Sequence, residues 1–494
     1  MAEKFKDAAQ VADGDPPIEQ GDSQLLATLG YKQELRRHYS TVQVFAIAFS
    51  IMGLLPSIAT TLSYSIPAGP VGMVWADLAS AMPTAGGLYF WTHYFSGEKW
   101  KNPLSFVVGY SNSLGLIGGV CSIDYGFATI LLSVVSIARD GNWTASRPVL
   151  YGTYVACVVV HGLIAIFCAR IMPKIQSACI VSNVGLVLAT VLALPIGKAV
   201  RGGQINSGTY VFGHSENLTT WPQGWTFMLS WMSPIWTIGA FDSCVHMSEE
   251  ASHAARAVPL GIIWSAGLCG LLGFVSLALI AAVINPDLNA VLNSSFGQPM
   301  AQIYYDALGK SGALGFMIVV AIVQFFMGLT SRQSWAFSRD GALPFSNFFR
   351  HVSKRVRYQP VRMVCFVVLI SVILGLLCLI DEAASSALFS LAVAGNDLAW
   401  MVPILSRLVW GKERFHPGEF YTGWFSKPIA ITAVVYLAYV IVLTQDMNYT
   451  IVINGSLWLG AMVYYVVYAR KVYRGPQMTV GGGGESSGLE EDEK

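Results

Sequence analysis

The chain carries many apolar runs that approach or exceed the length needed to cross a lipid bilayer, and this feature constrains its fold more than any other. A bilayer core about 30 Å thick takes roughly 20 apolar residues in a helix. In lipid, a spanning helix satisfies its own backbone polar groups. The sequence therefore predicts an all-α polytopic membrane protein. The eleven runs cover residues 42–66, 103–138, 149–169, 175–196, 225–245, 259–284, 312–330, 364–380, 384–409, 428–444 and 451–469.

Composition agrees with this class and argues against a soluble enzyme. Hydrophobic residues make up 54% of the chain and charged residues 12%, about half the charged share of a soluble domain. A net charge of +1 gives no reason to expect a nucleic-acid partner. No HExxH, GxSxG or Walker motif occurs, and the eight cysteines lie in or beside apolar runs without paired spacing. We therefore expect no enzyme activity, no metal and no cofactor, and we interpret the cysteines as packing residues.

The distribution of basic residues predicts the topology. If the N-terminus is cytosolic and residues 65–91 form a span, most lysines and arginines fall on the inner side, including the basic loop from Arg332 to Arg362. Four of the five possible glycosylation sites then fall in outer loops: Asn142, Asn217, Asn293 and Asn448. The fifth, Asn454, lies within a predicted span. This arrangement predicts about twelve spans with both termini in the cytosol. Residues 1–40 form a cytosolic tail, residues 41–472 the membrane domain, and residues 473–494 a disordered acidic tail.

The second of these spans is unusual. Residues 65–91 read SIPAGPVGMVWADLASAMPTAGGLYFW, and the longest run between prolines extends only from Val71 to Met82. Such a helix is too short for a regular crossing. The stretch is therefore predicted to be a short, distorted or re-entrant passage shielded by neighbouring helices.

Two spans carry helix breakers near their middle. The first reads VFAIAFSIMGLLPSIATTL, with Gly53 and Pro56, and the sixth reads WTFMLSWMSPIWTIGAFDSCVHMSEE, with Pro234 and Gly239. Unwinding frees backbone groups at membrane depth, and a polar ligand can supply their partners. Spans one and six correspond in a five-plus-five inverted repeat, where paired interruptions are typical of a transporter's binding site. Proline kinks without a ligand are the alternative.

A few polar side chains are predicted to lie at membrane depth. Asp124 and Asp242 are candidates for binding a ligand ammonium or a coupled proton, with structural roles as the alternative. For His161 and Asn183 we expect hydrogen bonds between helices. Two more such residues, Asn396 and Asp397, follow one another in a later run.

Four segments together resemble fungal permeases of the amino acid–polyamine–organocation superfamily, in the branch of the γ-aminobutyrate (GABA) and choline permeases. They read FSIMGLLPSIATTLSYSIPAGPVGMVW, ADLASAMPTAGGLYFWT, IGAFDSCVHMSEEASHAARAVPLGI and SRQSWAFSRDGALPFS. The resemblance covers about residues 25–472. It implies a leucine-transporter-like fold, with one repeat over about 41–197, a second over about 224–410, and two further spans over about 428–470. It also implies proton-coupled uptake of an amino acid, GABA, choline or a polyamine, in the plasma membrane or alternatively the vacuolar membrane.

The resemblance also implies a set of substrate-binding residues. In the first span, backbone amides of Ser50, Ile51, Met52 and Gly53 would bind the substrate carboxylate. In the sixth span the partner segment is Gly239, Ala240, Phe241 and Asp242, with Phe241 as an aromatic gate. The small-residue pattern of the family is only partly present, as SIMG, which leaves room for choline-like substrates.

The chain departs from the family in its second span. Relatives carry a full hydrophobic helix between GPVGMVW and ADLASAMP, whereas here Trp75 is followed directly by Ala76. The second span therefore reads as truncated, through exon skipping, a gene-model error or a degenerate paralogue. A non-transporting nutrient sensor, or an inactive paralogue or splice form, is the alternative to a working transporter.

Overall fold

The computed structural model describes residues 40–61, 87–168, 172–214, 232–248, 251–328, 360–380, 382–412, 421–442 and 449–471, together with single residues between them. Its described elements are helices and short 3-10 turns, which confirms the all-α prediction. The helices of the first half are α2 (Thr41–Met52), α3 (Leu54–Thr61), α5 (Gly87–Phe95), α6 (Lys101–Ala138), α7 (Arg147–Phe167), α8 (Met172–Val200) and α9 (Gly208–Gly213). Those that follow are α11 (Met232–Ile238), α12 (Ser243–His246), α13 (Ala254–Val283), α14 (Leu288–Leu292), α15 (Pro299–Met327), α18 (Val361–Leu374), η4 (Gly375–Leu379), α19 (Glu382–Val409), η5 (Gly423–Phe425), α20 (Ser426–Val442), α21 (Tyr449–Val467) and η6 (Ala469–Lys471).

Most of the long helices are suited to a bilayer by length and composition. Within the described ranges, eight helical stretches are long and apolar enough to cross it. Their outward faces carry large exposed apolar side chains such as Leu163, Leu192 and Trp264. Such faces are costly in water and stable against lipid. The protein is therefore an integral multi-pass membrane protein. The predicted second span, residues 65–91, lies outside the described residues except for its end, which forms the start of α5.

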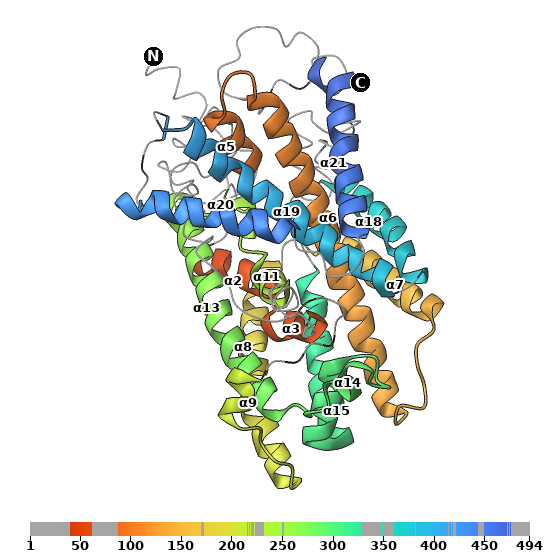
Figure 1. Cartoon of the computed structure of the whole chain (residues 1–494). Helices are drawn as coiled ribbons and strands as arrows, with labels where there is room; N and C mark the ends of the chain where they lie inside the picture. The colour runs from red at the N-terminus through yellow and green to blue at the C-terminus, as the bar shows by residue number, and fades with distance from the viewer. Residues whose placement is uncertain are drawn as a thin grey trace, which may run out of the picture.

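Two long helices, α6 and α19, pack closely along the centre of the molecule (Figure 1). Glycines allow this approach, because a Cβ atom added to Gly395 would lie 2.9 Å from the Cα atom of Gly115. One turn along, a Cβ atom on Gly118 would lie 2.9 Å from the backbone nitrogen of Ala392. Small residues at membrane helix interfaces let backbones meet in this way. The contact holds one face of α19 against one face of α6.

The two interrupted helices lie inside this framework (Figure 1), where α3 packs against α11 and α2 against α12. The first helix begins at a capping box formed by Ser40 and Gln43. It is interrupted at Gly53, which adopts the left-handed conformation with φ 46° and ψ 65°, a geometry that glycine adopts without steric cost. The hydroxyl of Ser57 donates a hydrogen bond of 2.5 Å to the carbonyl of Met52. The carbonyl of Met52 at the interruption therefore has a hydrogen-bond partner, which stabilises the break.

Candidate functional site

The second interruption separates α11 from α12. Residues 239–242 form turns between the two helices, at the glycine and aspartate where the sequence predicts the break. A hydrogen bond of 3.3 Å from the backbone N–H of Gly239 to the carbonyl of Trp236 closes the end of α11. Asp242 begins the short α12 and is 2% exposed. A carboxyl group is thereby placed at membrane depth on irregular backbone, which proteins tolerate only where it is buried or lines a cavity.

A cavity with a volume of about 70 Å³ lies between this interruption and the α6–α19 pair. Its wall is formed by the end of α2, by α3, by the middle of α6, by α11 and α12 with the interruption between them, and by the middle of α19. Its polar lining comes from Ser57, Asp242, Ser243, Asn396 and Asp397. The described residues that line it include no lysine or arginine. The cavity is therefore acidic.

Two side-chain oxygen atoms of α19 have no hydrogen-bond partner among the residues that the structure describes. The Oδ1 atom of Asn396 and the Oδ2 atom of Asp397 are buried and accept no hydrogen bond, and Asp397 is 1% exposed. A buried acceptor left unsatisfied costs about 1–3 kcal/mol, and more if it is charged. Native structures seldom keep such groups without a reason, and a ligand that donates hydrogen bonds is one. The cavity therefore suits a ligand that carries N–H donors and a positive charge.

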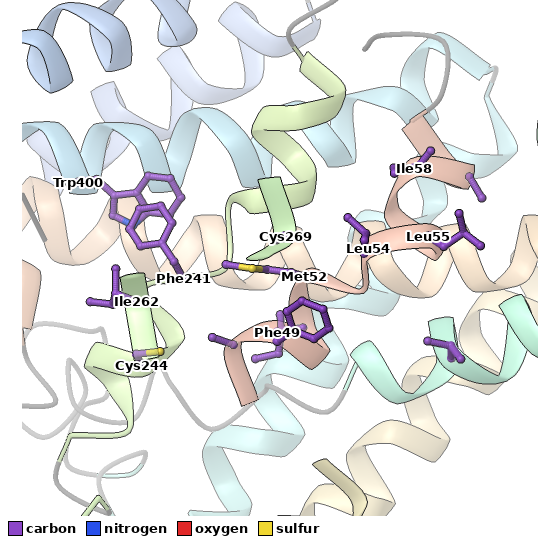
Figure 2. Packing of buried hydrophobic residues seen from close by; sticks show 14 of the residues in the cluster. Phe49, Met52, Leu54, Leu55, Ile58, Phe241, Cys244, Ile262, Cys269 and Trp400 are labelled. Carbon is purple, nitrogen blue, oxygen red and sulfur yellow. The ribbon is translucent and has the colours of Figure 1, made fainter. Parts of the chain in front are cut away.

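Asp242 is positioned by α19. The indole Nε1–H of Trp400 donates to its Oδ2 atom at 3.1 Å, and His246 Nε2 lies 3.6 Å from the same oxygen. Figure 2 shows the ring of Phe241 beside the indole of Trp400; the ring centroids are 4.5 Å apart. This aromatic pair and the hydrogen bond tie the interrupted sixth helix to α19. A ligand that binds at Asp242 would therefore affect both the sixth-span interruption and α19.

The residues predicted from the sequence fall into two groups around this cavity. Ile51, Gly239, Ala240 and Asp242 line it. The lining does not include Ser50, Met52, Gly53 or Phe241. Ser50 and Met52 are 1% exposed within α2, and Phe241 packs on Trp400. Whether any of these residues binds substrate stays a prediction.

Gly53 occupies a tightly packed position. A Cβ atom on Gly53 would lie 2.0 Å from the Sδ atom of Met327, at the end of α15. The interruption of the first helix is therefore pressed against α15.

The sequence interpretation named Asp124 as the only site candidate on α6, and it assigned no residue of α19 to the site. Asn396 and Asp397 were recognisable as polar residues in an apolar run, and Trp400 follows Asn396 by four residues, about one helical turn. Gly115 and Gly119 on α6 carried no comparable signal, although both line the cavity. Their role depends on which face of α6 meets α19.

The other carboxyl group predicted for a function, Asp124, lies outside the cavity lining. It is fully buried on α6, and its Oδ1 atom is 2.7 Å from His161 Nδ1 on α7. The prediction of an interhelical hydrogen bond for His161 is confirmed by this contact. Asn183 instead donates to the carbonyl of Cys179, four residues earlier in its own helix, at 3.1 Å. The prediction of an interhelical bond at Asn183 is wrong for this donor, because the preceding turn is within its reach.

Membrane-spanning helices packed around an acidic cavity, with two interrupted helices at its wall, define a membrane transporter. The chain belongs to the amino acid permease family, whose model matches residues 39–468. It is therefore a permease, a secondary transporter rather than an enzyme, and its substrates are small molecules.

The chain is similar to the following individual proteins. The GABA-specific permease of Saccharomyces cerevisiae is 45% identical over 92% of this chain and 86% of that protein. An amino-acid permease of Schizosaccharomyces pombe is 32% identical over 97% of this chain and 94% of that protein. A candidate polyamine transporter of Candida albicans is 27% identical over 93% and 89%. A crystal structure of an Eremococcus coleocola manganese transporter mutant is 14% identical, covers 93% of this chain and 98% of that chain, and has a TM-score of 0.48.

Proposed function

We propose that this permease takes up a primary amine of the GABA or polyamine class, binding its ammonium group in the acidic cavity. The observation that carries the proposal is the pair of unsatisfied acceptors on Asn396 and Asp397, which share the cavity with the carboxyl group of Asp242. A primary ammonium offers three N–H donors, so it can satisfy several of these oxygens at once. The relatives whose titles name GABA and polyamines support the same class.

The same geometry ranks the substrates that the sequence left open. A quaternary ammonium such as choline carries no N–H group, so it would neutralise charge but leave the oxygens of Asn396 and Asp397 without a hydrogen bond from its nitrogen. GABA and the polyamines carry that donor, and we rank them above choline. For the carboxylate of an amino acid we retain the first-span segment Ser50–Gly53 as the proposed binding region. Its support is the interruption at Gly53 and the position of Ile51 at the cavity wall.

We further propose that uptake is driven by protons, across the plasma membrane, with both termini in the cytosol. The family resemblance supports the driving ion, and the distribution of basic loops supports the orientation.

The decisive experiment measures uptake of radiolabelled GABA by the full chain in a yeast strain that lacks its own GABA uptake. Competition by amino acids, putrescine, spermidine and choline then ranks the substrates. Asp242→Asn and Asp397→Asn should each raise the apparent KM by roughly tenfold or more, because a charge-assisted hydrogen bond is lost. The matched control is Asp140→Asn, whose carboxylate is paired with Lys310 far from the cavity lining. Uptake that is unaffected by both cavity variants would contradict the proposed site.

The same assay separates a transporter from a sensor or an inactive form. A sensor would bind labelled GABA without accumulating it, and accumulation that collapses with a protonophore identifies proton-driven transport. The predicted truncation of the second span has its own test, which is sequencing of the transcript across Trp75 and Ala76. A transcript that encodes an additional helix there should restore stronger uptake when that helix is included.

A further inference from the structure

A second buried polar cluster lies outside the lining of the substrate cavity, where α6, α7 and α15 meet. His161 on α7 contacts two oxygen atoms at once. Its Nδ1 atom is 2.7 Å from Asp124 Oδ1 on α6, and its Nε2 atom is 2.7 Å from the carbonyl oxygen of Phe325 on α15. The side chains of His161 and Asp124 are 2% and 0% exposed. Three spanning helices are therefore joined through one imidazole ring.

Hydrogen-bond counting shows that this cluster holds a proton. A carbonyl oxygen only accepts, so the Nε2 atom of His161 must carry a hydrogen. If Nδ1 carried none and the carboxyl group were ionised, two acceptor atoms would face each other at 2.7 Å. That distance is typical of a charge-assisted hydrogen bond, so one proton lies between Nδ1 and Oδ1. The pair is neutral overall, either as imidazolium with carboxylate or as imidazole with carboxylic acid.

We propose that the Asp124–His161 pair is the binding site of the proton that is co-transported with the substrate; this inference rests on the proposed function. In each cycle the pair takes up one proton from the outer solution and releases one proton to the cytosol. The only covalent bond that forms and breaks is the N–H or O–H bond of that proton. The proton-free pair carries one negative charge in a region of low dielectric constant, which is costly there. The Oδ2 atom of Asp124 has no hydrogen-bond partner to compensate that charge.

The other titratable groups around this pair are thiols and a phenol, which do not ordinarily exchange a proton near pH 7. Cys157 Sγ on α7 lies 3.4 Å from Asp124 Oδ1 and 3.7 Å from His161 Nδ1. Cys121 on α6 and Tyr154 on α7 also interact with Asp124. Thiol and phenol groups are ordinarily neutral at pH 7, with reference pKa values of about 8.5 and 10. In the part of the chain that the structure describes, no lysine or arginine lies within 4.0 Å of Asp124. α15 presents the carbonyl of Phe325 and the amide of Gln324.

The end of α15 connects this pair to the first interrupted helix. Phe325 accepts the hydrogen bond from His161, and two residues later Met327 presses on Gly53. A Cβ atom on Gly328 would lie 2.3 Å from the imidazole ring of His161. When the proton leaves, the facing acceptors of Asp124 and His161 repel each other. Any movement of His161 then acts on the same end of α15 that supports the interruption at Gly53.

The wall of α6 provides a second connection to the substrate cavity. The amide of Gln324 on α15 donates to the carbonyl of Ile123 at 3.0 Å. Ile123 lines the cavity and precedes Asp124 directly. Two contacts of one helix end thereby connect the pair to the cavity wall, so that a movement of this end would affect both sites.

The test uses the full chain reconstituted in lipid vesicles, with labelled GABA as the probe and a pH-sensitive dye for proton movement. Asp124→Asn and His161→Gln each replace one titratable member by an amide that keeps a polar contact. Both variants should retain GABA exchange between the two sides, which needs no net proton movement. Both should lose GABA-driven proton uptake and pH-driven accumulation by about tenfold or more, within the range of site-to-site coupling. The matched control His214→Gln changes an exposed histidine of the α9 end and should behave as wild type.

The outcomes separate this inference from the proposed function. If both variants still accumulate GABA with protons as wild type does, the proton site is elsewhere and the inference is overturned, while the proposed function stands. If the wild-type chain neither transports nor exchanges any amine, the proposed function fails and the inference fails with it.

A direct measurement serves in case a variant does not fold. Nitrogen-15 NMR of histidine-labelled wild-type protein should show one buried imidazole protonated at Nε2, whose Nδ1 signal changes with pH in parallel with accumulation. A pH-independent buried histidine would overturn the proposal.

Discussion

Trp400 on α19 donates its indole hydrogen to the carboxyl group of Asp242 at 3.1 Å, although the two residues are 158 positions apart in the sequence. The bond fixes the acid of the interrupted sixth helix against the helix that supplies Asn396 and Asp397 to the same cavity. Asp242 and Asp397, which we propose to bind the ammonium, thereby lie in the wall of the same cavity, and the donor that holds Asp242 there is the uncharged indole of Trp400. The indole of Trp400 adds no positive charge that would compete with a cationic ligand.

Trp400→Phe should weaken substrate binding without unfolding the protein. Phenylalanine keeps the ring that packs on Phe241 but removes the donor to Asp242. Loss of one hydrogen bond to a charged group costs about 1.5–3 kcal/mol, so we expect the apparent KM for GABA uptake to rise about tenfold while protein abundance is kept. Trp264→Phe, at an exposed and lipid-facing position, is the control. An equal effect of both substitutions would show that the hydrogen bond is unimportant.

Gly53→Ala should abolish most transport. Alanine is strained at φ 46° by about 1–2 kcal/mol, and its Cβ atom would meet the Sδ atom of Met327 at 2.0 Å. The double variant with Met327→Ala removes the clash but not the strain, so it should recover activity only in part. Uptake normalised to surface expression measures both effects. Gly152→Ala on α7, where a Cβ atom meets nothing within 4 Å, should leave uptake unchanged.

Gly395→Ala should destabilise the contact between α6 and α19. The new methyl group would lie 2.9 Å from the Cα atom of Gly115, and overpacking of this kind costs typically about 1–3 kcal/mol. We expect a lower Tm in detergent than for the wild type. Gly460→Ala on α21 is the matched control, since its Cβ atom has open space. A wild-type Tm for Gly395→Ala would mean that the two helices separate easily.

Acidification should destabilise the protein partly through His93 on α5, which is not among the candidate spanning helices. Burial lowers the pKa of His93 below 6.5, and the hydrogen bond to Asn102 Oδ1 at 2.9 Å opposes that shift. Between the lowered pKa and 6.5 the unfolded chain binds more protons than the folded one, so the free energy of unfolding decreases as the pH falls.

The measurement for His93 compares thermal stability in detergent between pH 7.5 and pH 5. His93→Gln should lose less stability on acidification than the wild type, because glutamine binds no proton. His214→Gln serves as the exposed control. A wild-type pH dependence in His93→Gln would assign the effect to other groups.

Epitope tags at the two ends should both be reached from the cytosolic side. This follows if the chain crosses the membrane an even number of times, as the placement of its basic loops predicts. Protease protection of tagged vesicles measures it. Tags on opposite sides of the membrane would contradict our prediction that residues 65–91 cross it.

The positions of the helix interruptions were predictable from the sequence, whereas most of the cavity wall was not. Gly53 and Gly239 mark breaks because glycine and a nearby proline weaken a helix wherever they occur. Ile123, Gly115 and Gly119 carry no local sign of their role. Whether a helical residue faces a cavity, a neighbour or lipid depends on the rotation of the helix, and packing sets that rotation. The same holds for the contact between Met327 and Gly53, which joins distant parts of the chain.

The sequence by itself determined that this is an all-α membrane protein with interrupted first and sixth spans, because hydrophobic length and helix breakers act locally. Its permease character was indicated by the resemblance of four segments to a known family. Only the tertiary structure decided which polar groups meet. It brought Asn396 and Asp397 to Asp242 around one cavity, and it placed His161 between Asp124 and the carbonyl of Phe325. The meeting of α6 and α19 depends on their close approach at Gly115 and Gly395, which the spacing of residues along one helix does not show.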